Sequence, residues 1–165
     1  MISVRPAAST DAADIVAVRL ASWRATYGPY LPPHVWDDFD PAARAARLAA
    51  SIEAGSMRVL VAAADATVVG YSFSGACRDD DVPAGTGEVY AIYVQPSSWS
   101  TGAGRALMSA TLDSFGEVPV VLWVLEVNAR ARRFYELAGF VADGTVKPAE
   151  MPGGVTLPEL RYRRT

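Results

Sequence analysis

The residues with the clearest chemical potential lie around Gly102 and Gly104, between a run of bulky residues and a helical pattern. Glycines let the backbone approach a ligand closely, and the free N–H groups and dipole of a helix start favour a diphosphate without any lysine. Leu107 stands where the dinucleotide fingerprint has its third glycine, and no GK[ST] loop occurs, which argues against NAD and ATP. A glycine-rich turn that serves packing alone is the alternative that this spacing leaves open.

Two longer blocks decide between these interpretations: EVYAIYVQPSSWSTGAGRALM and LWVLEVNARARRFYELAGF. The first resembles the acetyl-CoA motif of the GNAT superfamily of N-acetyltransferases, a strand followed by Gln/Arg-x-x-Gly-x-Gly/Ala and a helix. The second resembles the family's later motif, in which a strand ends in Asn and a helix carrying FYE and then GF follows. The two blocks follow one another along the chain in the same order as the two motifs of the family. The resemblance extends over roughly the whole chain and implies a single N-acetyltransferase domain, residues 1–165.

The chain departs from the family pattern at the phosphate loop. Trp99 occupies the usual Gln/Arg position, and Ser100 and Thr101 replace the small or basic residues common beside it. Backbone amides must then carry more of the diphosphate binding. The two hydroxyls could add hydrogen bonds, and Arg105 is the nearest cation.

The resemblance implies acetyl-CoA as cosubstrate, with its pantetheine arm in a gap between two splayed strands. An N–H of Ile92 or Val94 would face the thioester carbonyl and stabilise the oxyanion as an amine attacks directly. No cysteine stands in either motif, and Cys77 lies in or beside a predicted exposed loop, which argues against a covalent acetyl-enzyme. The residues expected to bind the cofactor are Ile92, Tyr93, Val94, Ser100, Thr101, Gly102, Ala103, Gly104, Arg105, Asn128 and Tyr135.

The attacking amine must first lose a proton, because an alkylamine with a pKa near ~10.4 is almost fully protonated at neutral pH. Glu88 is the candidate base, acting through a water, since it begins a strand that is expected to be buried. The alternative is a glutamate at a strand end that faces solvent. The acidic run Asp79–Asp81 is a weaker candidate, because charged residues in a loop are usually solvated.

The departing thiolate needs a proton donor, and Tyr135 matches the tyrosine that fills this role in many family members. A phenol with a pKa near ~10 can donate to a thiolate of comparable basicity. The alternative role is a core aromatic, which we expect for the neighbouring Phe134. Asn128 can both cap the following helix and bond the pantetheine arm.

The acceptor pocket of related enzymes is shaped by the first helix and its loop, where Trp23, Tyr27 and Tyr30 stand. Core packing is the alternative for these aromatics. His34, expected in a loop after two prolines, is predicted to be solvated only. The expected acceptor is a primary amine of a small molecule or peptide. The alternatives are a non-catalytic acyl-CoA-binding or sensing module, and an acyltransferase for longer chains or protein N-termini.

The elements that must position these residues follow from periodicity and breakers. Asn128 and Gly139 should cap the last helix, and Thr10 or Asp11 the first. We predict helices from Asp11 through Trp23 towards Pro29, and over 41–53, 105–115 and 129–138. We predict strands over 1–5, 58–64, 67–76, 88–95, 119–127, 140–146 and 155–163, with an exposed loop over 77–87.

This order indicates a mixed α/β (α+β) fold: a mostly antiparallel sheet of about seven strands flanked by about four helices. The resemblance adds a splay between the fourth and fifth strands. A net charge of −3, with arginines spread along the chain, argues against nucleic acid as partner. The chain has one cysteine and no clustered metal ligands, so we expect neither a disulfide nor a bound metal. The sequence shows no leader and no apolar run long enough to cross a bilayer, so we expect a cytoplasmic protein without membrane contact. An exposed terminal strand could pair two subunits as a homodimer.

Overall fold

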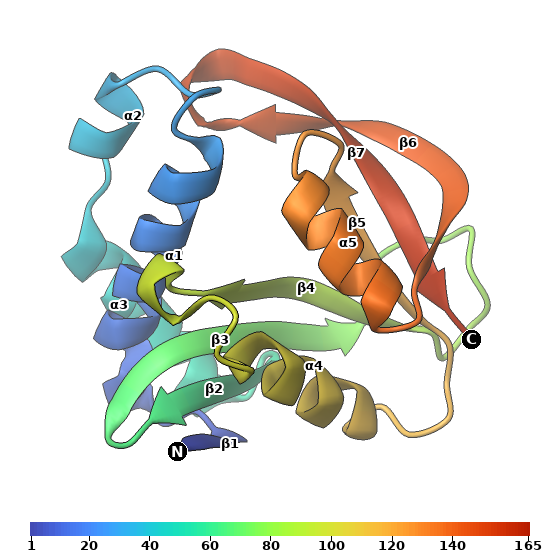
Figure 1. Cartoon of the computed structure of the whole chain (residues 1–165), viewed down its shortest axis with the longest axis horizontal. Coiled ribbons are helices and arrows are strands. Elements are labelled where there is room, and N and C mark those ends of the chain that lie inside the picture. Colours follow the sequence, from blue (N-terminus) through green and yellow to red (C-terminus); the bar gives the residue numbers. More distant parts are fainter.

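The computed structural model describes residues 1–165, which form one seven-stranded sheet with helices on both faces (Figure 1). The strand order is β1-β2-β3-β4-β5-β7-β6, and every neighbouring pair except β4 and β5 is antiparallel. The strands are β1 (Ile2–Pro6), β2 (Arg58–Ala64), β3 (Thr67–Ala76), β4 (Gly87–Val94), β5 (Val120–Leu125), β6 (Val141–Met151) and β7 (Val155–Arg164). The helices are α1 (Ala12–Tyr27), α2 (His34–Asp37), α3 (Pro41–Ala54), α4 (Ala103–Asp113) and α5 (Ala129–Leu137), with 3-10 turns η1 (Ser9–Asp11), η2 (Pro96–Ser98) and η3 (Pro152–Gly154). The predicted fold class is confirmed.

Helix α5 begins and ends where the sequence predicts. The Asn128 side-chain oxygen accepts a hydrogen bond from the Ala131 amide at 3.1 Å, which caps the first turn. Gly139 adopts a φ of +90° just past the helix, a conformation that favours glycine. The chain then turns inward, and Phe140 is buried in the core. The caps thus fix where α5 starts and how it leads into β6.

Three local predictions are wrong. Asp11 does not cap α1, because its carboxylate instead binds the Arg5 guanidinium at 2.7 and 2.9 Å, a stronger charge-assisted pair. His34 begins the short helix α2, whose preceding Pro33 already has helical dihedrals, although its side chain is exposed as expected. Strand β6 continues five residues beyond Val146 to Met151, because it keeps pairing with β7 after an irregularity.

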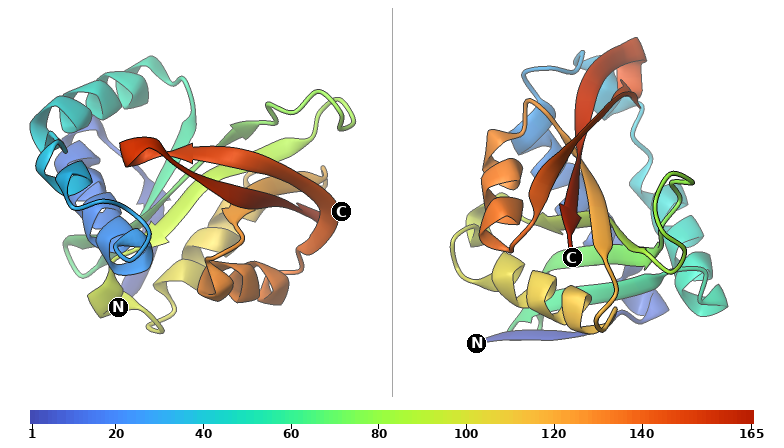
Figure 2. Two further views of the ribbon diagram at one scale, coloured as in Figure 1. Left: turned by 90° about the horizontal axis from the view of Figure 1, so that it is seen from above. Right: turned by 90° about the vertical axis from the view of Figure 1, so that its right-hand side faces the viewer.

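The helices divide between the two faces of the sheet (Figure 2). On one face Ile15 of α1 packs with Val61 of β2, and α3 covers the same cluster. On the other face Leu107 of α4 packs with Leu60, while Tyr135 of α5 joins a cluster over β5 and β7. Each layer buries an apolar stripe, so the sheet is covered on both sides.

The centre of the sheet opens between β4 and β5. These strands pair only over Gly87–Val89 and Val120–Leu122, and beyond Val89 they diverge (Figure 1). An irregularity in the β3–β4 register next to Tyr90 bends β4 at the same point. The predicted splay between the fourth and fifth strands is confirmed.

The two edges of the sheet are β1 and β6. The last strand, β7, lies between β5 and β6, so both of its edges are already paired. A strand-to-strand homodimer would therefore have to use β1 or β6. None of the helices combines the length and the apolar character that crossing a bilayer requires.

Candidate active site

The diverging end of β4 turns backbone amides toward the gap. The Gln95 amide donates to the Val69 carbonyl of β3 at 2.9 Å. Because backbone N–H groups alternate in direction along a strand, the amides of Ile92 and Val94 face away from β3 and toward the gap. The Val94 carbonyl, on the same side, accepts hydrogen bonds from Trp99 Nε1 at 2.7 Å and Ser22 Oγ at 3.1 Å. The two amides predicted to face the thioester therefore border the opening.

The loop between β4 and α4 holds an unusual backbone conformation. Ser100 has a φ of +64°, and Gly102, at the N-cap of α4, has a φ of +94°. A Cβ on Gly102 would meet nothing within 4 Å, so the backbone conformation alone requires glycine there. Arg105, Ser100 and Thr101 are exposed, whereas Ala103 is buried. The loop thus presents its amides to solvent at a helix start, which is the geometry that binds a diphosphate.

The side chains of this loop are used differently from the prediction. Thr101 Oγ1 donates to the Ser98 carbonyl at 2.8 Å, so this hydroxyl already has an internal partner. The Arg130 guanidinium of α5 stacks over the Trp99 ring at 3.7 Å. A cation therefore stands beside Trp99, the residue at the motif's usual Gln/Arg position. Sequence reasoning missed Arg130 because the stacking joins two elements that the chain separates by thirty residues.

Three tyrosines from different elements converge at the gap: Tyr27 of α1, Tyr93 of β4 and Tyr135 of α5. Burial raises the pKa of Tyr135, and the nearby Tyr93 adds to this shift. Burial likewise raises the pKa of Tyr27, and Tyr93 and Tyr135 contribute further, while Asn128 opposes them. Each phenol is thus held in its protonated form, which is the form that can donate a proton.

A side-chain hydrogen bond joins the start of α5 to the end of α1. Asn128 Nδ2 donates to the Tyr27 hydroxyl at 3.1 Å, in addition to the cap that its oxygen provides. The Trp23 ring contacts Tyr27 edge-on, with centroids 5.2 Å apart. Tyr30 is 43% exposed, and its side chain takes no part in these contacts. The structure therefore gathers two of the three predicted acceptor residues and leaves the third outside.

Glu88 is buried, with 1% of its surface exposed, so the alternative of a solvent-facing glutamate is wrong. Arg78 holds it: its Nη2 donates to Oε1 at 2.6 Å and its Nε to Oε2 at 3.1 Å. The Arg78 amide adds a third hydrogen bond at 2.9 Å. A carboxylate has about four lone-pair sites, so Arg78 alone occupies three of them.

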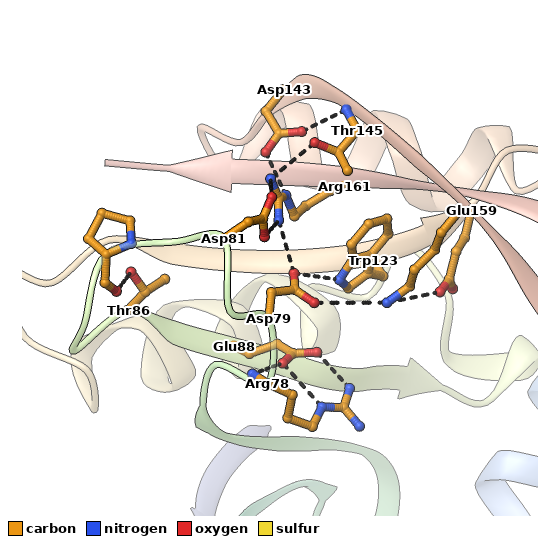
Figure 3. A network of polar contacts seen from close by, with 12 residues as sticks. Arg78, Asp79, Asp81, Thr86, Glu88, Trp123, Asp143, Thr145, Glu159 and Arg161 are labelled. Carbon is orange, nitrogen blue, oxygen red and sulfur yellow. Dashed lines mark hydrogen bonds and ion pairs between the residues drawn. The ribbon is translucent and has the colours of Figure 1, made fainter.

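The loop over 77–87 is not uniformly exposed as predicted. Asp79 and Asp81 fold back onto β7 and bind the buried Arg161, which also binds Asp143 of β6 (Figure 3). Trp123 Nε1 donates to Asp79 at 3.0 Å. Ion pairing to a residue some eighty positions away orders this acidic segment, and no loop pattern in the sequence indicates such a partner.

A further carboxylate that the sequence did not single out lies on the same side of β7. Glu159 is half-buried, and burial raises its pKa, although Lys147, with its Nζ 3.6 Å away, opposes the shift. Arg78 and Glu88 also influence its titration, so these groups lie near one another (Figure 3). Two carboxylates, Glu88 and Glu159, therefore lie near each other, and Glu88 stands in the last stretch where β4 still pairs with β5.

Cys77 follows β3 directly and lies near Glu88 and Asp79, which influence its titration. It lines a pocket of about 320 Å³ together with the β3–β4 loop and Phe115, and none of the predicted cofactor-binding residues borders this pocket. Burial raises the pKa of its thiol, which disfavours the nucleophilic thiolate. No three His, Cys, Asp or Glu side chains gather in a way that could hold a metal ion.

Comparisons with known proteins show which family shares this sequence and fold. A family model described as the acetyltransferase (GNAT) family matches residues 15–140. An uncharacterized N-acetyltransferase of Mycobacterium bovis is 33% identical over 140 residues, which is 82% of this chain and 86% of the relative. The structure of yncA from Salmonella typhimurium with its cofactor acetyl-CoA is 25% identical, with a TM-score of 0.72, over 99% of this chain and 92% of that one. The Thermoplasma acidophilum PaiA N-acetyltransferase in complex with coenzyme A is 18% identical, with a TM-score of 0.76, over 100% and 99% of the two chains. The opened sheet, the glycine-bearing helix start and these matches together show that the chain belongs to the GNAT family of acetyltransferases.

Proposed function

We propose that the protein transfers the acetyl group of acetyl-CoA to a primary amine of a small molecule or peptide by direct attack. The observation that carries this proposal is the early end of β4–β5 pairing at Val89, which leaves the amides of Ile92 and Val94 facing an open gap. An amide in that position is preorganised to stabilise the oxyanion that forms when an amine attacks a thioester.

The cofactor would enter from the side of α4 and α5. The loop from Ser100 to Gly104 offers amides at a helix start for the diphosphate, with Arg130 and Arg105 as nearby cations. The acyl-bearing arm would then run past Asn128 to the tyrosine group. The cofactor carried by the Salmonella neighbour supports acetyl-CoA as the cosubstrate.

Proton transfers would take place on the two sides of the thioester. We assign removal of the amine proton to Glu88, through a water. Tyr135 would protonate the departing thiolate, since its phenol is buried beside Tyr93 and keeps its proton at neutral pH. Cys77 lines a pocket that none of the predicted cofactor-binding residues borders, which supports transfer without a covalent acetyl-enzyme.

The test is free-thiol release from acetyl-CoA with a panel of amines, for wild type and Tyr135→Phe. General acid catalysis contributes at least about 10²-fold, so the variant should lose about that factor in kcat. Tyr30→Phe, which removes the same hydroxyl from an exposed site, is the matched control and should retain full activity. Tight acetyl-CoA binding without release for any amine would instead favour a sensing module.

A further inference from the structure

A second pocket, of about 190 Å³, opens between α1, α2, the start of α3 and the turn η3. Its lining residues are Arg19, Leu20, Trp23, His34, Val35, Trp36, Asp38, Phe39, Arg44, Pro152 and Gly153. This volume is below the roughly 300 Å³ at which pockets for drug-sized ligands begin. The pocket therefore suits one functional group and a short stem of a ligand that extends beyond it.

The pocket brings two guanidinium groups together without a counterion. Neither Arg19 nor Arg44 forms an ion pair with a carboxylate, and the exposed Asp38 at the rim is paired with neither. Burial, then the charges of Arg19 and Arg47, hold the pKa of Arg44 below its ordinary value, and Asp40 opposes this only in part. Like charges that face one pocket repel, and a bound anion would relieve that repulsion.

Aromatic rings hold both cations in place. The Arg19 guanidinium lies 5.1 Å from the Trp23 ring, and that of Arg44 lies 4.5 Å from the Phe39 ring. Arginine side chains that pack against rings lose little further freedom on binding a ligand, and a guanidinium can bind a carboxylate or phosphate in a fork. The rings also give the pocket an apolar wall for the stem of a ligand.

Two buried polar groups beside Arg19 lack partners. Trp23 Nε1 and the Tyr71 hydroxyl have no hydrogen-bond partner. Of the two residues only Trp23 lines the pocket, since Tyr71 is fully buried in the core. An indole N–H can only donate, so Trp23 adds one unpaired donor to the residues around the pocket. An unsatisfied buried donor costs about 1–3 kcal/mol, which an acceptor group that reached the Trp23 N–H would offset. The cations and this donor thus point to the same ligand chemistry, an oxyanion.

The pocket also adjoins the acetyl-transfer gap. Trp23 lines the pocket and contacts Tyr27, whose hydroxyl binds Asn128 beside the proposed path of the cofactor arm. A molecule seated between Arg19 and Arg44 would extend along this wall toward the three tyrosines. We infer that the acceptor is an amine that also carries an oxyanion group, a carboxylate or a phosphate, which this pocket binds while the amine reaches the thioester. The inference rests on the proposed acetyl transfer and names its substrate class.

Thiol release from acetyl-CoA, measured with matched acceptors, tests the inference. One series compares amino acids and short peptides with their carboxamides, and a second compares aminoalkyl phosphates with the corresponding amino alcohols. The acidic member of at least one series should show a kcat/KM higher by about 10-fold or more, and the series that responds identifies the oxyanion. Arg44→Gln should remove most of this preference by raising the KM for the acidic acceptor. Arg47→Gln, one turn away and outside the pocket, should keep it.

A binding measurement keeps the inference separate from catalysis. Trp23 and Trp36 line the pocket, so their fluorescence should report titration with N-acetylglycine or inorganic phosphate, and Arg44→Gln should abolish the response. Equal rates for acids and their neutral analogues, with no Arg44-dependent fluorescence response, would overturn the inference while leaving acetyl transfer intact. Absence of thiol release with every amine would instead refute the proposed function.

Discussion

Removing the Arg161 guanidinium tests how the acidic β3–β4 loop is held beside the active site. Arg161 is 6% exposed at its side chain and binds Asp79, Asp81 and Asp143 at 3.2, 2.6 and 2.7 Å. In Arg161→Met two carboxylates lose their cation while mostly buried, since the side chains of Asp79 and Asp143 are only 15% and 17% exposed. Asp81, at 56%, is solvated and adds little.

Removing one partner of a buried ion pair lowers the free energy of unfolding by about 3–5 kcal/mol. Lys147 stays 4.0 Å from Asp79 and compensates in part, so we expect the lower end, about 3 kcal/mol. For a chain of this size that corresponds to a Tm lower by roughly 6–12 °C. Urea unfolding at pH 7 measures the loss. Arg164→Met, an exposed arginine of the same strand without an ion pair, is the control.

The stability difference between wild type and Arg161→Met should also depend on pH, in a direction that the pKa of Asp143 sets. Burial alone would raise the pKa of Asp143, but hydrogen bonds from the Thr145 amide and from Arg161 hold it below its ordinary value. Stability from such a carboxylate is fully present above its unfolded pKa of about 4 and is lost as the pH falls through the lower folded pKa. The difference between wild type and Arg161→Met should therefore be largest at neutral pH and shrink in acid. A difference below about 1 kcal/mol at pH 7, or one that acid leaves unchanged, would refute the reasoning.

Three further predictions concern the site itself. Gly102→Ala forces a side chain into a φ of +94°, so it should lower the free energy of unfolding by about 1–2 kcal/mol and weaken acetyl-CoA binding in calorimetry. Gly104→Ala should be tolerated, because its Cβ would meet only ordinary contacts from 3.4 Å. Arg130→Gln should weaken acetyl-CoA binding by up to about 5-fold, and added salt should reduce that difference; an effect that salt does not change would exclude a charge contact. Glu88→Gln should lower kcat by about 10²-fold, with Glu159→Gln as the comparison, and the reverse pattern would move the base to Glu159.

The local motifs of the cofactor site could be predicted from the chain alone. The glycine at the start of α4, the Asn128 cap and the Gly139 stop each depend on the conformation of a few consecutive residues. Such signals are short-range, because capping and left-handed dihedrals are properties of neighbouring backbone groups. The order of helices and strands follows from apolar periodicity for the same reason.

The side-chain partners could not be predicted in this way. Glu88 was singled out from its place on β4, yet Arg78 as its partner follows from the path of the loop after β3. Arg130 was passed over because its stacking on Trp99 depends on how α5 packs beside the β4–α4 loop. A helix or strand pattern states which face of an element is apolar, but it does not state which residues of another element it will meet.

The sequence by itself determined the family motifs, the element order and the glycine-bearing start of α4, because these depend on residues adjacent in the chain. Only the tertiary structure brought Tyr27, Tyr93 and Tyr135 to one opening and set Arg19 beside Arg44 without a counterion. Those arrangements depend on strand register and helix packing, which bring together residues that lie far apart in the sequence.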